Sequence, residues 1–80
     1  MLEQLNTAHK VVGIKQLRRS LQEGSVQTVF IAENADPALT EPILEHCKIN
    51  HVQWVLVPTM AELGKACGIS VGAAAAGILS

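Results

Sequence analysis

Segments with the apolar period of a strand alternate along this chain with segments that have the period of a helix. Two apolar runs rich in β-branched residues, 27–32 and 52–57, predict buried strands. Between them a helix is expected to begin at Asp36 and Pro37, a preferred N-cap followed by a preferred first helical residue. This alternation predicts an α/β fold, a three-layer α/β/α sandwich around a central mixed sheet of about four strands.

Glycines and capping residues delimit the other elements. Gly24 ends an amphipathic helix, and a capping box at Thr59 and Glu62 begins another that ends at Gly68. Alanine favours helix in the last segment, but its position after a glycine-bounded loop favours a strand. In chain order the expected elements are a helix over 2–8, a strand over 9–12, a helix over 14–23, a strand over 27–32, a helix over 37–48, a strand over 52–57, a helix from Thr59 to Gly68 and a strand over 73–79.

Composition predicts one compact domain, residues 1–80, with an aliphatic core. Hydrophobic residues make up 49% of the chain and charged residues 16%, which excludes a disordered chain. Phe30 and Trp54 are the only aromatic residues apart from histidine. Because aromatic platforms for stacking bases are therefore scarce, nucleic-acid contacts would depend on charge, backbone groups and small apolar side chains.

The chain has the features of a cytoplasmic protein. Its first residues lack the basic start and long apolar run of a signal peptide, and the apolar stretch 71–79 is too short to span a bilayer. Cys47 and Cys67 stand twenty residues apart without a partnering motif, so we expect them to be reduced and buried.

Basic residues are concentrated although the formal net charge is only −1. The segment 4–22 holds no acid but four bases, which are Lys10, Lys15, Arg18 and Arg19. Lys65 belongs to a second segment, and only Lys48 lies elsewhere. Such local concentration predicts a basic face that could bind phosphate groups while the remainder of the surface stays neutral or acidic.

The helix expected over 14–23 separates its residues into two faces. Its apolar face consists of Ile14, Leu17 and Leu21, and its polar face of Lys15, Arg18, Arg19 and Gln22. Gly13 precedes the first turn, where unpaired N–H groups and the positive end of the helix dipole suit a phosphate. The alternative interpretation of the basic stripe is a solvated charged face.

Two apolar residues lie in the second segment, 63–72. Ile69 and Val71 are flanked by Gly68 and Gly72, so in a loop both would be exposed and could pack against an unstacked base. Taken alone, the residues favour a different interpretation, in which they begin the last strand and at least one is buried.

Three segments resemble those of a known family. Gly13-Ile14-Lys15-Gln16-Leu17, followed by Arg19 and Gly24, resembles the RNA-recognition helix of the L-seven-Ae family of kink-turn-binding ribosomal proteins. Segment 31–37 resembles the strand-to-helix turn of this family, and segment 63–73 resembles its second RNA-contacting loop. The resemblance extends over residues 8–79 and is closest to the short bacterial, ribosome-associated members, which also have Lys and Gln where most members have Asn and Glu.

The resemblance implies that the partner is structured RNA containing a kink-turn, in ribosomal or regulatory RNA. Lys15 would then donate to guanine O6 or N7, and Ile69, Ser70 and Val71 would cover the nucleotide extruded from the bulge. The implied RNA-binding residues are Gly13, Ile14, Lys15, Gln16, Arg18, Arg19, Glu33, Lys65, Ile69, Ser70, Val71 and Gly72. We expect a monomer without a cofactor or a metal, and no membrane partner.

Residues suited to catalysis are scattered. His46 and His51 are five positions apart, which is wrong for one helical face, and no Cys or His spacing fits zinc. We therefore expect no enzymatic activity. Two alternatives to RNA binding remain: a small-ligand or nucleotide-binding domain with a concave pocket at Gly13, and a protein-interaction module in which Ile69 and Val71 contact the partner.

Overall fold

The computed structural model describes residues 3–7 and 9–80, so the ends of the helix predicted over 2–8 lie outside the described residues. The elements are α1 (Gln4–Thr7), β1 (Lys10–Val12), α2 (Ile14–Gln22), β2 (Val26–Ala32), α3 (Pro37–Asn50), β3 (Gln53–Val57), α4 (Met60–Ala66) and β4 (Ala75–Leu79). Every predicted segment therefore has the predicted type, with boundaries that differ by one or two residues in most cases.

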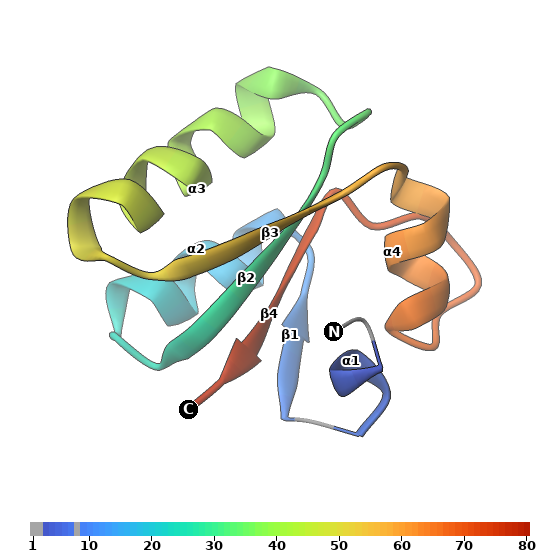
Figure 1. Ribbon diagram of the computed structural model, residues 1–80, viewed down its shortest axis with the longest axis horizontal. Coiled ribbons are helices and arrows are strands. Elements are labelled where there is room, and N and C mark those ends of the chain that lie inside the picture. The colour runs from blue at the N-terminus through green and yellow to red at the C-terminus, as the bar shows by residue number, and fades with distance from the viewer. Residues whose placement is uncertain (1–2, 8) are drawn as a thin grey trace.

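The four strands form one mixed sheet in the order β1-β4-β2-β3. β4 is antiparallel to both β1 and β2, whereas β2 and β3 are parallel. The C-terminal ends of β1, β2 and β3 therefore lie at one edge of the sheet together with the beginning of β4 (Figure 1). We call this edge, where α2, α3 and α4 all begin, the helix-start edge.

Helices cover both faces of the sheet, which confirms the predicted sandwich. Figure 1 shows α2 and α3 on one side and α1 and α4 on the other. Side chains of β2 alternate between the two faces, as the pleat of a strand requires. Val29 and Ile31 pack with Leu17 and Ile43 beneath α2 and α3, whereas Phe30 packs with the core beneath α1 and α4.

Local capping explains where the helices begin and end. Asp36 Oδ1 accepts a hydrogen bond from Ala38 N at 3.0 Å, and Thr59 Oγ1 accepts one from Glu62 N at 3.1 Å. α3 continues two residues beyond the predicted end at Lys48, because His51 adopts the left-handed conformation that ends the helix, with φ of 58°.

The favoured interpretation of Ile69 and Val71 was wrong. β4 begins only at Ala75, and the side chains of Ile69 and Val71 are 37% and 69% exposed. The chain turns at Gly68, where φ is 80°, and then returns along α4 toward the sheet. Ala73 N donates to Met60 O at 3.0 Å, so residues 69–72 lie against a helix and pair with no strand.

Candidate nucleic-acid interface

The beginning of α2 is open at the helix-start edge. Gly13 has φ of 99° and ψ of 154°, and a Cβ atom placed on it would have no neighbour within 4 Å among the described residues. Glycine is therefore required at this position by the backbone conformation and not by close packing. Among the described residues no side chain caps the helix, so N–H groups of the first turn remain available at the positive end of the dipole.

The two faces of α2 are those that the sequence predicts. Leu17, Ser20 and Leu21 are buried, and Ile14 is half-buried against the same core. The opposite face is exposed and consists of Lys15, Gln16, Arg18, Arg19 and Gln22. Since α2 begins at the helix-start edge, Lys15 is the basic residue of this helix that lies nearest that edge.

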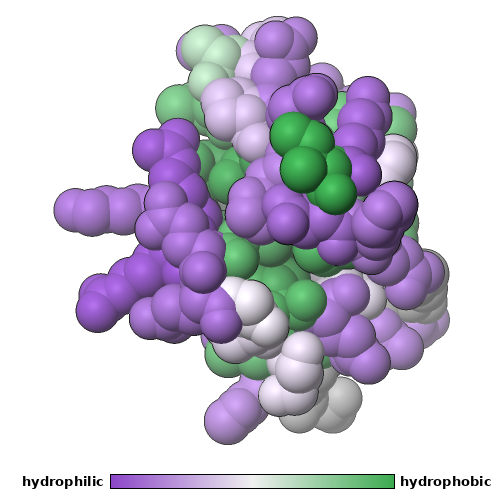
Figure 2. Space-filling view, turned by 90° about the vertical axis from the view of Figure 1, so that its left-hand side faces the viewer, coloured by the Kyte–Doolittle hydropathy of each residue, from purple (hydrophilic) through white to green (hydrophobic). Residues whose placement is uncertain are grey.

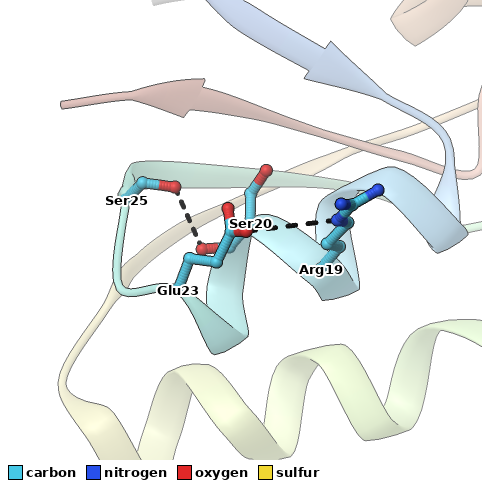
Figure 3. A network of polar contacts seen from close by, with 4 residues as sticks. All are labelled: Arg19, Ser20, Glu23 and Ser25. Atoms are coloured by element: carbon cyan, nitrogen blue, oxygen red, sulfur yellow. Dashed lines mark hydrogen bonds and ion pairs between the residues drawn. The ribbon is translucent and has the colours of Figure 1, made fainter.

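Arg19 lies farther along α2 and faces an acid. Its Nε is 4.0 Å from Glu23 Oε2, and the two side chains are 83% and 63% exposed (Figure 3). An exposed pair of this length contributes little to stability, but it offsets part of the Arg19 charge. Among the described residues neither Lys15 nor Arg18 forms an ion pair.

The end of α2 is attached to the start of β2 through Ser20 and Ser25. The carbonyl oxygen of Ser20 accepts hydrogen bonds from Ser25 N and Ser25 Oγ, both at 3.1 Å (Figure 3). Figure 2 shows hydrophobic atoms at the bottom of a hollow with a hydrophilic rim, at the end of the molecule opposite the helix-start edge. A hollow of about 400 Å³ between the ends of α2 and α3 is lined by Leu21, Val26 and Val52 together with the polar residues Gln22, Glu23, His46 and Asn50.

Residues 69–72, which we call the apolar loop, are held tightly against α4. Ile69 N donates to Gly64 O at 3.1 Å. A Cβ atom on Gly64 would overlap the carbonyl oxygen of Val71, and one on Gly72 would lie 3.1 Å from Met60 Cβ. Gly64 is therefore required by close contact, and the space beside Gly72 is tight. This packing fixes the loop while its two apolar side chains remain exposed.

Asn34 connects the β2–α3 turn to the same helix, and sequence reasoning missed its role. Its Oδ1 accepts a hydrogen bond from Met60 N at 2.8 Å, while Glu33 N donates to Val57 O at 2.8 Å. An Asn after a buried strand is a recognisable turn residue, but a partner 26 residues away leaves no local signal. The turn, the first residue of α4 and the apolar loop are thus joined.

The helix-start edge brings together about half of the predicted site. Gly13 N donates to Ala75 O at 2.9 Å, which places the start of α2 beside the end of the loop that precedes β4. Gly13, Ile14, Lys15, Gln16, Glu33 and Gly72 lie at or next to this edge, whereas Ile69, Ser70 and Val71 follow the end of α4 and run back along that helix toward the edge. Arg18 and Arg19 follow on the exposed face of α2.

Lys65 and Lys10 lie on the other side of the sheet. Lys65 lines a cavity of about 520 Å³ with Asn6 of α1 and Glu62 of α4. Lys10 lies on the same face of β1 as Val12, two residues further on, and Val12 packs on the core beneath α1 and α4. The structure therefore separates the five clustered bases into three on α2 and two on the opposite face, and an RNA contact by Lys65 stays a prediction.

Both cysteines are buried and free, as predicted. Burial raises the pKa of the Cys47 thiol and of the Cys67 thiol, and the positive charge of Lys10 offsets part of the effect on Cys67. Within residues 3–7 and 9–80 no group of three or more His, Cys, Asp or Glu side chains is arranged to hold a metal ion. No helix in the described part of the chain is long and apolar enough to cross a membrane.

Comparison with known proteins identifies the family. The model of the "Ribosomal protein L7Ae/L30e/S12e/Gadd45 family" matches residues 2–80. The chain belongs to this family. It is 44% identical over 75 residues to "RNA-binding protein GWCH70_0105" of Geobacillus sp. (strain WCH70), covering 94% of this chain and 92% of that protein. It is also 44% identical to "RNA-binding protein YbxF" of Geobacillus stearothermophilus, covering 86% of this chain and 84% of the relative.

Solved structures have the same fold. The "Giardia lamblia 15.5kD RNA binding protein" is 27% identical with a TM-score of 0.85, and the match covers 99% of this chain and 72% of that one. A Bacillus halodurans protein of unknown function is 22% identical with a TM-score of 0.87, covering 99% and 83%. The names of the family and of the RNA-binding relatives describe no enzyme.

Proposed function

We propose that this chain is a cytoplasmic RNA-binding protein that recognises and stabilises kink-turns in structured RNA, and that it associates with the ribosome. The observation that carries the proposal is the hydrogen bond from Gly13 N to Ala75 O at 2.9 Å. Through it the open start of α2 lies beside Ala75, the first residue of β4, which follows the apolar loop by three residues. One RNA element could therefore contact both surfaces at once.

A kink-turn is a duplex bent sharply at a short bulge next to sheared G·A pairs. Regular A-form RNA hides its major groove in a narrow cleft, and the bend opens the groove to a helix N-terminus. In this proposal Lys15 donates to guanine O6 or N7, and Gln16 supplies a second polar contact. Backbone N–H groups of the first turn and Arg18 bind phosphates. Glu33 borders the same edge and completes the polar surface.

The apolar loop gives the second contact. Ile69 and Val71 are exposed although large apolar side chains are usually buried, and they project from a loop that close packing holds in place. They cover the nucleotide extruded from the bulge, with Ser70 between them. Binding selects the kinked conformer, because only that shape presents the open groove and the extruded base together.

The two alternatives have less support. A ligand-binding domain requires a concave pocket at Gly13 and buried Ile69 and Val71, but both side chains are exposed and Gly13 lines neither of the two cavities described above. A protein-interaction module explains the exposed loop and leaves the basic face of α2 without a role. It predicts binding that depends weakly on salt, whereas several phosphate contacts predict a steep dependence.

The proposal is tested by titrating a kink-turn RNA at fixed salt. The control is the same RNA with its sheared G·A pairs replaced by Watson–Crick pairs. Much tighter binding to the kink-turn supports the proposal. Equal affinity for both RNAs would mean that α2 binds polyanions in general and does not recognise the kink-turn. No binding to either RNA refutes the proposal. Co-sedimentation with ribosomal subunits on a sucrose gradient tests ribosome association separately.

Two matched variants test the role of α2. Lys15→Ala should weaken binding by about 1–3 kcal/mol, the usual contribution of a contact to a base edge. Lys10→Ala removes the same charge from the opposite side of the sheet and should have a smaller effect. Equal losses in both variants would contradict a base contact by Lys15.

A further inference from the structure

The outer edge of β3 lacks the features that usually prevent an edge strand from pairing with another chain. β3 is the last strand in the sheet order, so among the described residues no strand pairs with its outer edge. Exposed edge strands usually carry a charge, a proline or a bulge that prevents pairing with another chain. Gln53–Val57 contains neither charge nor proline, and its register with β2 is regular from end to end.

This strand also exposes two large apolar side chains on one face. Trp54 is 38% exposed and Leu56 51% exposed. Val55 and Val57 point to the opposite face and pack on the core beneath α1 and α4, so Trp54 and Leu56 lie on the side of α2 and α3. The surface therefore combines free backbone groups with an adjacent apolar pair.

Helix α3 lies beside this surface and carries opposite charges at its two ends. Ile43 and Cys47 define its buried side, and His46 lines the hollow with α2, so the flank away from α2 borders the β3 edge. At 100° per residue that flank contains Glu41 and Lys48, which are both exposed, with half-buried Leu44 between them. Glu41 and Lys48 are seven residues apart, about two turns.

We propose that the β3 edge binds a second copy of this chain, as an antiparallel β3–β3 pair about a two-fold axis at Val55. In this register Trp54 of each copy lies opposite Leu56 of the other, an aromatic–aliphatic cross-strand pair. The same residues contact each other twice, as a two-fold interface requires. The product is a continuous eight-stranded sheet, and it replaces the monomer expected from the sequence.

Charge complementarity selects a second copy over other occupants. The two-fold axis reverses α3, so Glu41 of one copy faces Lys48 of the other in two equivalent pairs. RNA is disfavoured here, because Glu41 and the neighbouring Glu45 repel phosphates. An unrelated protein partner would not explain why the charges of this surface match each other across a two-fold axis.

The interface is small, one five-residue strand and one helix flank, so the association is weak and depends on concentration. It leaves α2 and the helix-start edge free. Since the two-fold axis reverses the strands, the two helix-start edges point in opposite directions. The dimer is thus independent of RNA binding, and failure of either proposal leaves the other standing.

The single tryptophan of the chain lies in this interface and reports on it directly. Sedimentation equilibrium of the full chain should show the mass rising from 8.5 kDa toward twice that value between micromolar and millimolar concentration. Trp54 emission should shift to shorter wavelength over the same range, because pairing removes the indole from water. A constant monomer mass up to millimolar concentration would overturn the proposal.

Charge exchange distinguishes this geometry from other dimers. Glu41→Lys and Lys48→Glu should each weaken self-association about tenfold, because like charges then face each other in two places. An equimolar mixture of the two variants should regain association as a heterodimer, and the double variant should regain it as a homodimer. All these positions are exposed, and circular dichroism verifies folding.

Leu56→Lys supplies an independent control, because a charge on the edge strand should abolish pairing without affecting the core. Dimers that form equally well in Glu41→Lys, Lys48→Glu and Leu56→Lys would show that another surface is responsible and would refute the β3 edge.

Discussion

The contact between α4 and the apolar loop can be tested by a single methyl group. In Gly64→Ala the new Cβ would overlap the carbonyl oxygen of Val71 and lie 3.0 Å from its carbonyl carbon and 3.1 Å from Gly72 Cα. All three are backbone atoms, so no side chain can rotate to relieve the overlap. The loop must move away from α4, or α4 must tilt.

Two opposing terms determine the size of the effect. Alanine favours an α-helix over glycine by about 1 kcal/mol, which would stabilise the variant if the space were free. Overpacking of a tight contact costs typically about 1–3 kcal/mol, and a backbone obstacle places Gly64→Ala at the upper end of that range. The free energy of unfolding should therefore fall by about 2 kcal/mol, which lowers the Tm of a domain of this size by about 10 °C.

Thermal unfolding followed by circular dichroism measures the loss, with Ala61→Gly as control at an exposed position of the same helix. The control should cost only its helix propensity, about 0.5–1 kcal/mol. Kink-turn affinity should fall in Gly64→Ala at a temperature where the variant is fully folded, because the displaced loop no longer meets the extruded nucleotide. A Gly64→Ala protein that is more stable than the parent would refute the close contact on which this reasoning rests.

Three further predictions follow from buried or connecting groups. Asn34→Ala should lower the free energy of unfolding by about 0.5–1.5 kcal/mol in urea, because Met60 N loses its acceptor at an exposed position, and Asn34→Asp should restore most of it. Leu17→Ala should lower the free energy of unfolding by about 2–5 kcal/mol, because the Leu17 side chain on α2 is fully buried in the core. A broadened, non-cooperative urea transition would be a second sign that this core is disrupted. Burial raises the pKa of Cys47 and Cys67, so the unfolded chain releases these protons first as pH increases; unfolding curves should show stability falling above about pH 8.5, and replacement of both residues by Ala should remove that fall.

Most of the fold could be predicted because the signals that define it are local. Asp36 and Thr59 cap their helices through partners two and three residues away, and such spacings are visible in the sequence. The strands were evident from runs of β-branched residues, and the faces of α2 from helical period. The type of the last element, β4, was ambiguous in the sequence, because its alanines favour a helix and only its place after a glycine-bounded loop favours a strand.

The parts of the site that sequence reasoning missed depend on contacts between distant segments. Exposure of Ile69 and Val71 follows from the close fit of Gly64 against the loop, and neither glycine spacing nor hydropathy predicts such a fit. The partner of Asn34 lies 26 residues away. The position of Lys65 also depends on the fold, because α4 lies on the face of the sheet opposite α2 (Figure 1), whereas the sequence alone had placed Lys65 in one set of RNA-binding residues with those of the basic helix.

Strand order explains how one small domain presents two distant segments as one surface. β1, β2 and β3 all run toward the helix-start edge, so any chain with this order begins α2, α3 and α4 there. β4 runs in the opposite direction between β1 and β2, which brings the preceding loop to the same edge beside Gly13. Had β4 been placed at the outside of β3, two strands, β2 and β3, would separate the start of β4 from Gly13 at the end of β1. The same order leaves β3 at the boundary of the sheet, so the arrangement that assembles the proposed RNA surface also exposes the strand proposed to pair with a second copy.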